Sequence, residues 1–155
     1  MSNAEVSCFL KHTEALKQAS NSEYKYTLII EDDVIISKNF YRKFNKLLKN
    51  IEKFEWDVIF IGSGIGRRFM FKKLKLKMFF SSPQIAFHPA SNCADSYIIK
   101  KESAEILLKN FKTFHLSYDW ELAYQMYKLN FNVYWATRPL FEQGSKTGNY
   151  RSELR

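Results

Sequence analysis

Three consecutive acidic residues, Glu31, Asp32 and Asp33, directly follow a run of apolar and β-branched residues that ends at Ile30. Neighbouring carboxylates repel one another unless a cation compensates their charge. Hard cations such as Mg2+ and Mn2+ bind oxygen ligands, and proteins often share them between carboxylates and a substrate phosphate. The triplet therefore predicts a divalent-metal site that grips a diphosphate. The alternative interpretation is a solvated acidic turn, because charged residues are common at strand ends.

The residues around the triplet predict a strand, a helix and a second strand. Residues 25–30 and 56–61 are apolar runs typical of inner strands. Between them, residues 38–54 have apolar residues at helical spacing, with Ser37 as the candidate N-cap. This order predicts a right-handed crossover between a parallel pair of strands. Ligands in α/β sheets bind where strands end, which is where the triplet lies.

The rest of the chain predicts a single α/β domain over residues 1–155. Helices are expected at residues 5–19, 101–110 and 119–129, and short strands at 84–88, 96–99 and 132–135. In the helix at 101–110 we expect Ala104, Ile106, Leu107 and Leu108 to face inward. Residues from 142 onward are polar and predict a loop or tail, with 146–155 flexible. Residues 1–4 resemble an expression-tag remnant, and we assign them no function.

The composition restricts the class of protein. A content of 46% hydrophobic residues can fill a core, and no apolar stretch reaches the ~18 residues that a membrane span needs. No secretory signal peptide is recognisable, which is compatible with a cytoplasmic location without establishing it. Cys8 and Cys93 are too few for a disulfide framework and lack a metal-ligand spacing, so we expect free thiols. The three histidines, His12, His88 and His115, form no zinc pattern.

The net charge of +8 predicts an anionic partner, which is a nucleotide-sugar, an anionic membrane surface or nucleic acid. The basic stretch at residues 67–77 could contact an anionic surface peripherally, and its alternative is a solvated charged face. No RNP, KH or helix-turn-helix signature is evident. A nucleic-acid-binding module is therefore the weaker alternative, and we expect no specific nucleic acid.

Two further carboxylates, Asp119 and Glu121, begin a predicted helix beside Tyr118 and Trp120. An aromatic ring next to a carboxylate suits a sugar acceptor, because sugars stack on ring faces. A helix N-terminus also stabilises an anion. These features predict a general base that takes the proton of an acceptor hydroxyl. The alternative is that Asp119 is an ordinary N-cap.

Six segments resemble, in order, the motifs of glycosyltransferase family 25, which includes lipooligosaccharide sugar transferases and collagen galactosyltransferases. The first three are residues 6–12 (VSCFLKH), 28–34 (LIIEDDV) and 56–62 (WDVIFIG). They are similar to the family's Gly-Cys-x-x-Ser-His, Leu-Glu-Asp-Asp-Val and Trp-Asp-x-(apolar)3-Gly motifs. The others are residues 94–99 (ADSYII), 119–120 (DW) and 139–145 (PLFEQGS). They resemble Thr-Asp-Ala-Tyr-x-Ile, an Asp ahead of a helix, and Pro-Leu-(apolar)-x-Gln-x-Ser. Lys11 stands where the family usually has Ser.

The resemblance implies a GT-A-like fold, with a mixed, mostly parallel sheet flanked by helices. It also implies a UDP-sugar donor, a Mn2+ or Mg2+ cofactor, and transfer of a hexose, galactose or glucose. The implied acceptor is a hydroxyl group on a glycan, a lipooligosaccharide or a collagen-like hydroxylysine. Family members carry a strand, a helix and another strand before the first motif, whereas this chain starts at that motif. The resemblance thus implies a fragment or an N-terminally shortened member.

Carried over onto this sequence, the resemblance implies roles for individual residues, with Asp32 mainly orienting the turn. The candidate residues are Asp33, Glu31 and Asp95 for the metal; Glu31, Asp32, Gln143 and Ser145 for the nucleotide-sugar; and Asp119 and Glu121 for catalysis.

Two enzyme-related alternatives stay open at this point. One is a relative of the family that binds a nucleotide or a glycan without turnover. The other is a phosphoryl transferase or phosphatase that uses the acidic triplet, although such enzymes usually show a nucleophile or a P-loop and neither is found here.

Overall fold

The computed structural model describes residues 1–63, 84–85, 94–113, 115–136 and 139–148. Several sequence predictions lie outside these ranges. They are the strand at 86–88, the basic stretch at 67–77, the environments of His88 and Cys93, and the tail from 149.

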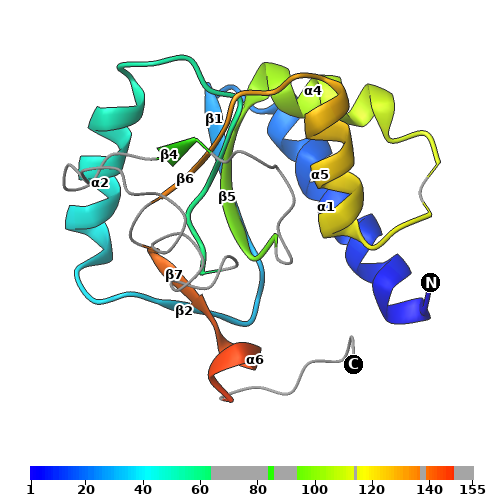
Figure 1. Ribbon diagram of the computed structural model, residues 1–155, viewed down its shortest axis with the longest axis horizontal. Coiled ribbons are helices and arrows are strands. Elements are labelled where there is room, and N and C mark those ends of the chain that lie inside the picture. The colour runs from blue at the N-terminus through cyan, green and yellow to red at the C-terminus, as the bar shows by residue number, and fades with distance from the viewer. Residues whose placement is uncertain (64–83, 86–93, 114, 137–138, 149–155) are drawn as a thin grey trace.

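The described residues form a three-layered α/β arrangement (Figure 1), which confirms the predicted class. One sheet lies between α2 on one side and α1, α4 and α5 on the other (Figure 1). The helices are α1 (Asn3–Asn21), α2 (Phe40–Ile51), α4 (Lys101–Asn110), α5 (Tyr118–Lys128) and α6 (Gly144–Thr147). The strands are β1 (Tyr26–Ile30), β2 (Val34–Ile36), β3 (Val58–Phe60), β4 (Gln84–Ile85), β5 (Ser96–Lys100), β6 (Val133–Trp135) and β7 (Phe141–Gln143).

The main sheet has the strand order β1-β5-β3-β6-β4. It is mixed, but the expectation of a mostly parallel sheet was wrong. Among the described strands, β3 and β6 pair in parallel, whereas the β1–β5, β3–β5 and β4–β6 pairs are antiparallel. The strands β1 and β3 point the same way, yet β5 lies between them, so they are not the neighbouring pair that the sequence predicted. Local patterning could not show this, because β5 comes from much later in the chain.

The sheet is buried on both faces, and successive residues of a strand face opposite cores. Ile29 and Ile99 pack in one core with residues of α1, α4 and α5. Ile98 packs in the other core with Leu47 and Ile51 of α2. This burial on both sides explains why the strands read as continuous apolar runs rather than as alternating ones.

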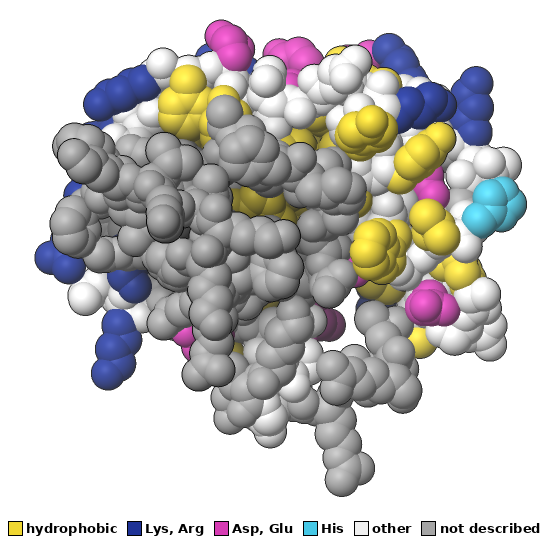
Figure 2. All heavy atoms as spheres, in the orientation of Figure 1, with side chains coloured by type: hydrophobic (Ala, Val, Ile, Leu, Met, Phe, Trp, Pro, Cys, Tyr) yellow, Lys and Arg dark blue, Asp and Glu magenta, His cyan; other side chains and the backbone are white. Residues whose placement is uncertain are grey.

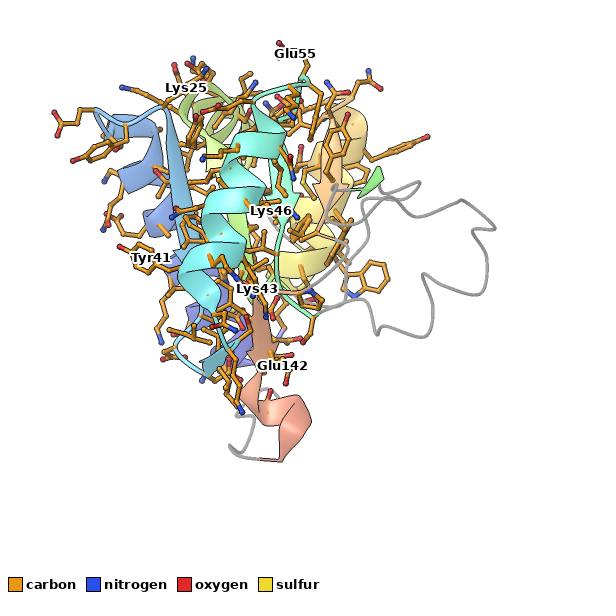
Figure 3. All side chains as sticks on the ribbon, turned by 90° about the vertical axis from the view of Figure 1, so that its left-hand side faces the viewer. Lys25, Tyr41, Lys43, Lys46, Glu55 and Glu142 are labelled. Atoms are coloured by element: carbon orange, nitrogen blue, oxygen red, sulfur yellow. The ribbon has the colours of Figure 1, made fainter. Side chains whose placement is uncertain are left out.

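The segment after β6 returns to the acidic triplet and forms a second, two-stranded sheet. Strand β2 pairs antiparallel with β7, with Val34 opposite Gln143 and Ile36 opposite Phe141. The short helix α6 follows immediately, and Glu142 marks this end of the molecule in Figure 3. The prediction of a loop or tail from residue 142 was therefore wrong for residues 142–147.

Some helix details also differ from expectation. The predicted cap Ser37 instead accepts a hydrogen bond from Lys43 Nζ at 3.1 Å. The residue at the N-cap of α2 is Asn39, in a left-handed conformation with φ 60°. Figure 3 shows α2 face-on, with Lys43 along it. In α4, Ile106 was predicted to face inward but is 40% exposed.

At the chain start, Ser2 and Glu5 form a capping box for α1, so residues 3–4 belong to its first turn. None of the helices in the described part of the chain has the length and apolar character needed to cross a membrane.

Candidate functional site

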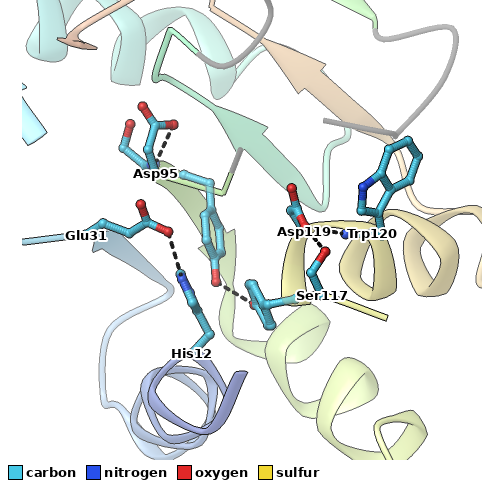
Figure 4. Close-up of polar contacts among 9 residues, drawn as sticks. His12, Glu31, Asp95, Ser117, Asp119 and Trp120 are labelled. Atoms are coloured by element: carbon cyan, nitrogen blue, oxygen red, sulfur yellow. Dashed lines mark hydrogen bonds and ion pairs between the residues drawn. The ribbon is translucent and has the colours of Figure 1, made fainter. Parts of the chain in front are cut away.

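The site begins where β1 ends and β5 starts. Because the two strands are antiparallel, with Ile30 opposite Ser96, the residues just beyond them are brought together. The backbone N–H of Glu31 donates to the carbonyl oxygen of Asp95 at 2.8 Å. Figure 4 shows both carboxylates at this edge of the sheet. Two of the three predicted metal ligands are therefore neighbours.

Asp95 is fully buried, at 0% exposure, and is held against a glycine. Its Oδ1 accepts a hydrogen bond from the backbone of Ser96 at 2.9 Å. A Cβ atom at Gly62 would overlap the Asp95 carboxylate. Gly62 lies two residues after Phe60, the last residue of β3, so the turn beyond that strand leaves the space that this carboxylate occupies. A side chain at position 62 cannot coexist with the observed position of Asp95.

The third predicted ligand, Asp33, contacts the C-terminal segment. Its carbonyl oxygen accepts from the N–H of Gly144 at 2.8 Å, and its Oδ2 accepts from the N–H of Ser145 at 3.4 Å. Its other oxygen, Oδ1, is buried and has no hydrogen-bond partner among the described residues. The N–H of Gln143 donates to Ser63 Oγ at 3.4 Å. The structure thus brings Asp33 into contact with the backbone of Gly144 and Ser145, while Gln143 pairs with Val34, the residue next to Asp33.

Helix α1 forms a wall of the site. His12 Nε2 and Glu31 Oε1 are hydrogen-bonded at 3.2 Å (Figure 4). The imidazole ring stacks on Tyr118, with 4.0 Å between ring centres and 8° between planes. The hydroxyl of Tyr118 is itself hydrogen-bonded to that of Tyr97 at 2.8 Å. Burial raises the pKa of both phenols, so these rings act as neutral packing partners.

Cys8 lies one helical turn before His12. Burial, together with the charges of Glu31, Asp119 and Asp32 and against the opposing charge of Lys11, raises the pKa of its thiol to about 11. The thiol therefore lies close enough to the acidic triplet and to Asp119 to experience both. Free thiol was the expectation for Cys8, and it is free in the structure.

The two α1 residues were missed as members of a site. The histidines form no zinc pattern in the sequence, and Cys8 and Cys93 lack a metal-ligand spacing. The available signal was their separation of four residues, which places both side chains on one face of a helix. What the sequence could not show is that Glu31 faces them.

The two predicted catalytic residues have different environments. Asp119 lies in the first turn of α5, and its Oδ1 accepts from Ser117 Oγ at 2.6 Å and from the N–H of Trp120 at 3.0 Å. Glu121 is buried, with 6% exposure, and accepts from Gln125 Nε2 at 2.8 Å. The negative charges of Asp119 and Glu31 both raise the pKa of the Cys8 thiol.

Exposed aromatic side chains flank Asp119 along α5. Trp120, Tyr124 and Tyr127 are all exposed, and hydrophobic side chains gather over this part of the surface in Figure 2. Rings at an exposed surface beside a carboxylate suit the stacking of a sugar.

The donor set at the sheet edge fits a hard divalent cation. Glu31, Asp33 and Asp95 carry carboxylate oxygens of the type that Mg2+ and Mn2+ prefer. Among the described residues, however, the ligand atoms found within 4.8 Å of one another are those of Cys8, His12 and Glu31, so Asp33 and Asp95 would have to move closer to Glu31 to share one ion with it. Asp33 Oδ1 is buried and has no hydrogen-bond partner among the described residues, which costs free energy. A bound cation would supply the missing partner.

Comparison with known proteins identifies the family. The profile described as glycosyltransferase family 25 (LPS biosynthesis protein) matches residues 1–122. The chain belongs to glycosyltransferase family 25. The match includes α1, the acidic triplet, Asp95 and Asp119, whereas Gln143 and Ser145 lie beyond the matched residues.

Relatives of known name are similar over parts of the chain. Procollagen galactosyltransferase 2 of Homo sapiens is 29% identical over 118 residues, which cover 70% of this chain and 17% of the human protein. Procollagen galactosyltransferase 2 of Mus musculus is 39% identical over 64 residues, which cover 40% of this chain and 10% of the mouse protein. An inactive glycosyltransferase 25 family member 3 of Mus musculus is 31% identical over 64 residues, covering 40% of this chain and 11% of that protein. The chain thus spans less than a fifth of the length of these relatives.

Proposed function

We propose that this family 25 domain is a metal-dependent hexosyltransferase that moves galactose or glucose from a UDP-sugar to a hydroxyl acceptor. The observation that carries the proposal is the meeting of Asp33 with residues 143–145 beside Glu31 and Asp95. Glu31 and Asp33 belong to one acidic triplet, the backbone of Glu31 is hydrogen-bonded to that of Asp95, and one buried Asp33 oxygen has no partner among the described residues. Such a cluster is unfavourable unless it binds a cation.

The chain's own residues would divide the work as follows. Asp33 and Glu31 would hold the cation, and Asp95, fixed by Gly62 and Ser96, would support them. A bound Mn2+ or Mg2+ would supply Lewis-acid stabilisation of the negative charge that develops on the departing diphosphate. Glu31 is fixed in direction by His12, and Asp33 by Ser145, so both carboxylates are oriented before the donor binds. Asp32 would orient the turn, and Gln143 and Ser145 would border the donor.

We assign the general base to Asp119 in preference to Glu121. Its Oδ1 is held by Ser117 and Trp120 at the start of α5, a position that stabilises an anion. In an inverting transfer, this carboxylate would take the acceptor proton as the new glycosidic bond forms. Trp120, exposed beside it, offers a ring face for the acceptor sugar. The acceptor class is a glycan or a protein hydroxyl, and the named galactosyltransferase relatives make a collagen-like peptide the first acceptor to try.

A turnover assay tests this proposal. The purified chain would be incubated with radiolabelled UDP-galactose or UDP-glucose, with Mn2+ or with EDTA, and with a hydroxylysine-containing collagen peptide or a lipooligosaccharide. We expect Mn2+-dependent release of UDP and label in an acceptor, both lost on chelation. Absence of turnover with every donor and acceptor, combined with Mn2+-dependent UDP binding, would instead support a non-catalytic family 25 protein. The similarity to a relative named as inactive motivates this second candidate.

A further inference from the structure

A cluster of three side chains of different chemistry lies beside the all-oxygen site. The Sγ of Cys8, a ring nitrogen of His12 and a carboxylate oxygen of Glu31 all lie within 4.8 Å of one another. Cys8 and His12 come from successive turns of α1, and Glu31 follows β1. The three groups therefore come from two elements that the packing of α1 beside β1 holds together.

These donor types differ from those of the nucleotide site. Thiolate, imidazole and carboxylate are the three ligand types that zinc takes in proteins, and three protein ligands with one open position are typical of a non-structural zinc site. Tetrahedral zinc with bonds of about 2.0–2.3 Å separates its ligand atoms by roughly 3.3–3.8 Å. The observed cluster would need to contract by only about 1 Å to reach that geometry. A hard cation such as Mg2+ would gain little from the sulfur atom.

The His12 imidazole is held in place by its neighbours, and one of its ring nitrogens has no hydrogen-bond partner among the described residues. His12 is buried, and its ring is fixed by stacking on Tyr118. Nε2 bonds the Glu31 carboxylate, while Nδ1 is buried without a hydrogen-bond partner in the described part of the chain. An unpartnered buried nitrogen is costly, and a fixed ring loses little freedom when it binds a metal. The ring is thus prepared as a ligand.

The charge around the thiol also favours a cation. Glu31, Asp32 and Asp119 all act on Cys8, and Lys11 is the cation that opposes them most directly. With three negative groups and one positive group, the surroundings of Cys8 are negative, although the whole chain carries +8.

We propose that Cys8, His12 and Glu31 form a binding site for a zinc-like divalent cation, separate in its donor set from the oxygen site at Asp33. Because Glu31 belongs to both sites, zinc bound here withdraws that carboxylate from the nucleotide site. This second consequence rests on the proposed function, whereas the metal site itself does not. Zinc bound at this site therefore inhibits Mn2+-dependent nucleotide binding.

Cobalt spectroscopy tests the site without any nucleotide. Co2+ added to the reduced, metal-free chain should give a near-ultraviolet thiolate-to-cobalt charge-transfer band that saturates at one ion per chain and is displaced by Zn2+. The Cys8→Ser variant should lose the band and bind Zn2+ at least about tenfold more weakly. Cys93→Ser is the matched control and should keep the band. A wild-type chain without the band, or a Cys8→Ser variant that retains it, overturns the proposal.

A second measurement covers the case in which Cys8→Ser does not fold. In the wild-type chain, Zn2+ should slow iodoacetamide alkylation of Cys8, measured by peptide mass spectrometry with Cys93 as the internal reference. Equal alkylation of Cys8 with and without Zn2+ contradicts the site. The predicted inhibition by zinc has its own test. Zn2+ should weaken Mn2+-dependent UDP binding by the wild-type chain but not by a folded Cys8→Ser variant. If the chain binds no UDP at all, the proposed function fails while the cobalt result still decides the metal site.

Discussion

The backbone N–H of Ser145 donates to the Asp33 carboxylate, although the two residues are 112 positions apart in the chain. The β2–β7 pairing makes this possible, because it places Val34 opposite Gln143. The C-terminal segment therefore orients the carboxylate on which the proposed cation site depends. Its contribution comes from a backbone group, so it can be tested separately from the Ser145 side chain.

Ser145→Pro should weaken Mn2+-dependent UDP binding by roughly fivefold, because it removes the donor of a hydrogen bond worth about 1 kcal/mol. Proline is tolerated in the first turn of a helix, where Ser145 lies. Ser145→Ala keeps the N–H and is the matched control, with binding expected to stay near the wild-type value. Calorimetric titration of both variants checks this. If the alanine variant loses as much affinity as the proline variant, the side chain is the group that matters.

Gly62→Ala should destabilise the fold by about 1–3 kcal/mol, because its methyl group overlaps the buried Asp95 carboxylate. Urea unfolding followed by circular dichroism measures this cost. In an Asp95→Ala background the space is open, so the same substitution should cost clearly less, and the two changes should not be additive. Equal costs in both backgrounds would show that Gly62 is required for a reason other than Asp95.

Asp57, the second residue of the Trp-Asp motif, has a structural role. Its Oδ1 accepts from Ser103 Oγ at 2.9 Å and its Oδ2 accepts from the N–H of Asn132 at 2.8 Å, so it joins β3 to α4 and β6. Asp57→Ala should lower the free energy of unfolding by about 2–3 kcal/mol. UDP binding by the folded fraction should not change, because Asp57 precedes β3 and Gly62 follows it. Lost UDP binding with unchanged stability would contradict this assignment.

Asp119→Asn should lower the transfer rate by about 10²–10⁴-fold, as expected for loss of a general base. An amide oxygen can still accept from Ser117 and Trp120, so the start of α5 should be preserved. Glu121→Gln is the matched comparison, and we expect it to affect stability more than rate because Glu121 is buried against Gln125. Initial transfer rates of the two variants, with and without added acceptor, would measure the effect of each on the rate. A normal rate for Asp119→Asn means that another group takes the proton.

The sequence predicted the positions of several elements where local signals were strong. The apolar run that ends at Ile30 placed the acidic triplet at the end of a strand, and helical spacing gave α4 its observed bounds of Lys101–Asn110. The strand β2 was missed because three apolar residues carry little periodic signal, and its partner β7 lies near the other end of the chain. The α1 ligands were missed for a related reason. Spacing places Cys8 and His12 on one helix face, but only tertiary packing brings Glu31 to them.

The pairing of β1 with β5 shows the same limit. The apolar run at residues 26–30 predicted an inner strand, but β1 is an edge strand in which Ile29 is buried and Ile30 is exposed. Nothing in these residues names the strand that pairs with them or its direction. Yet this pairing is what places Asp95 beside Glu31.

The central claim is that the carboxylates at residues 31–33 bind a cation that holds a nucleotide diphosphate. The most direct test is calorimetric titration of UDP into the wild-type and Asp33→Asn chains, with Mn2+ and with EDTA. Asparagine preserves the shape and can still accept from Ser145, whereas Glu55→Gln removes one exposed negative charge at the opposite end of the molecule from Glu142 (Figure 3) and serves as the charge control. We predict Mn2+-dependent binding by the wild-type and Glu55→Gln chains, and its loss in Asp33→Asn. Equal Mn2+-dependent UDP binding by Asp33→Asn and wild type would contradict the account.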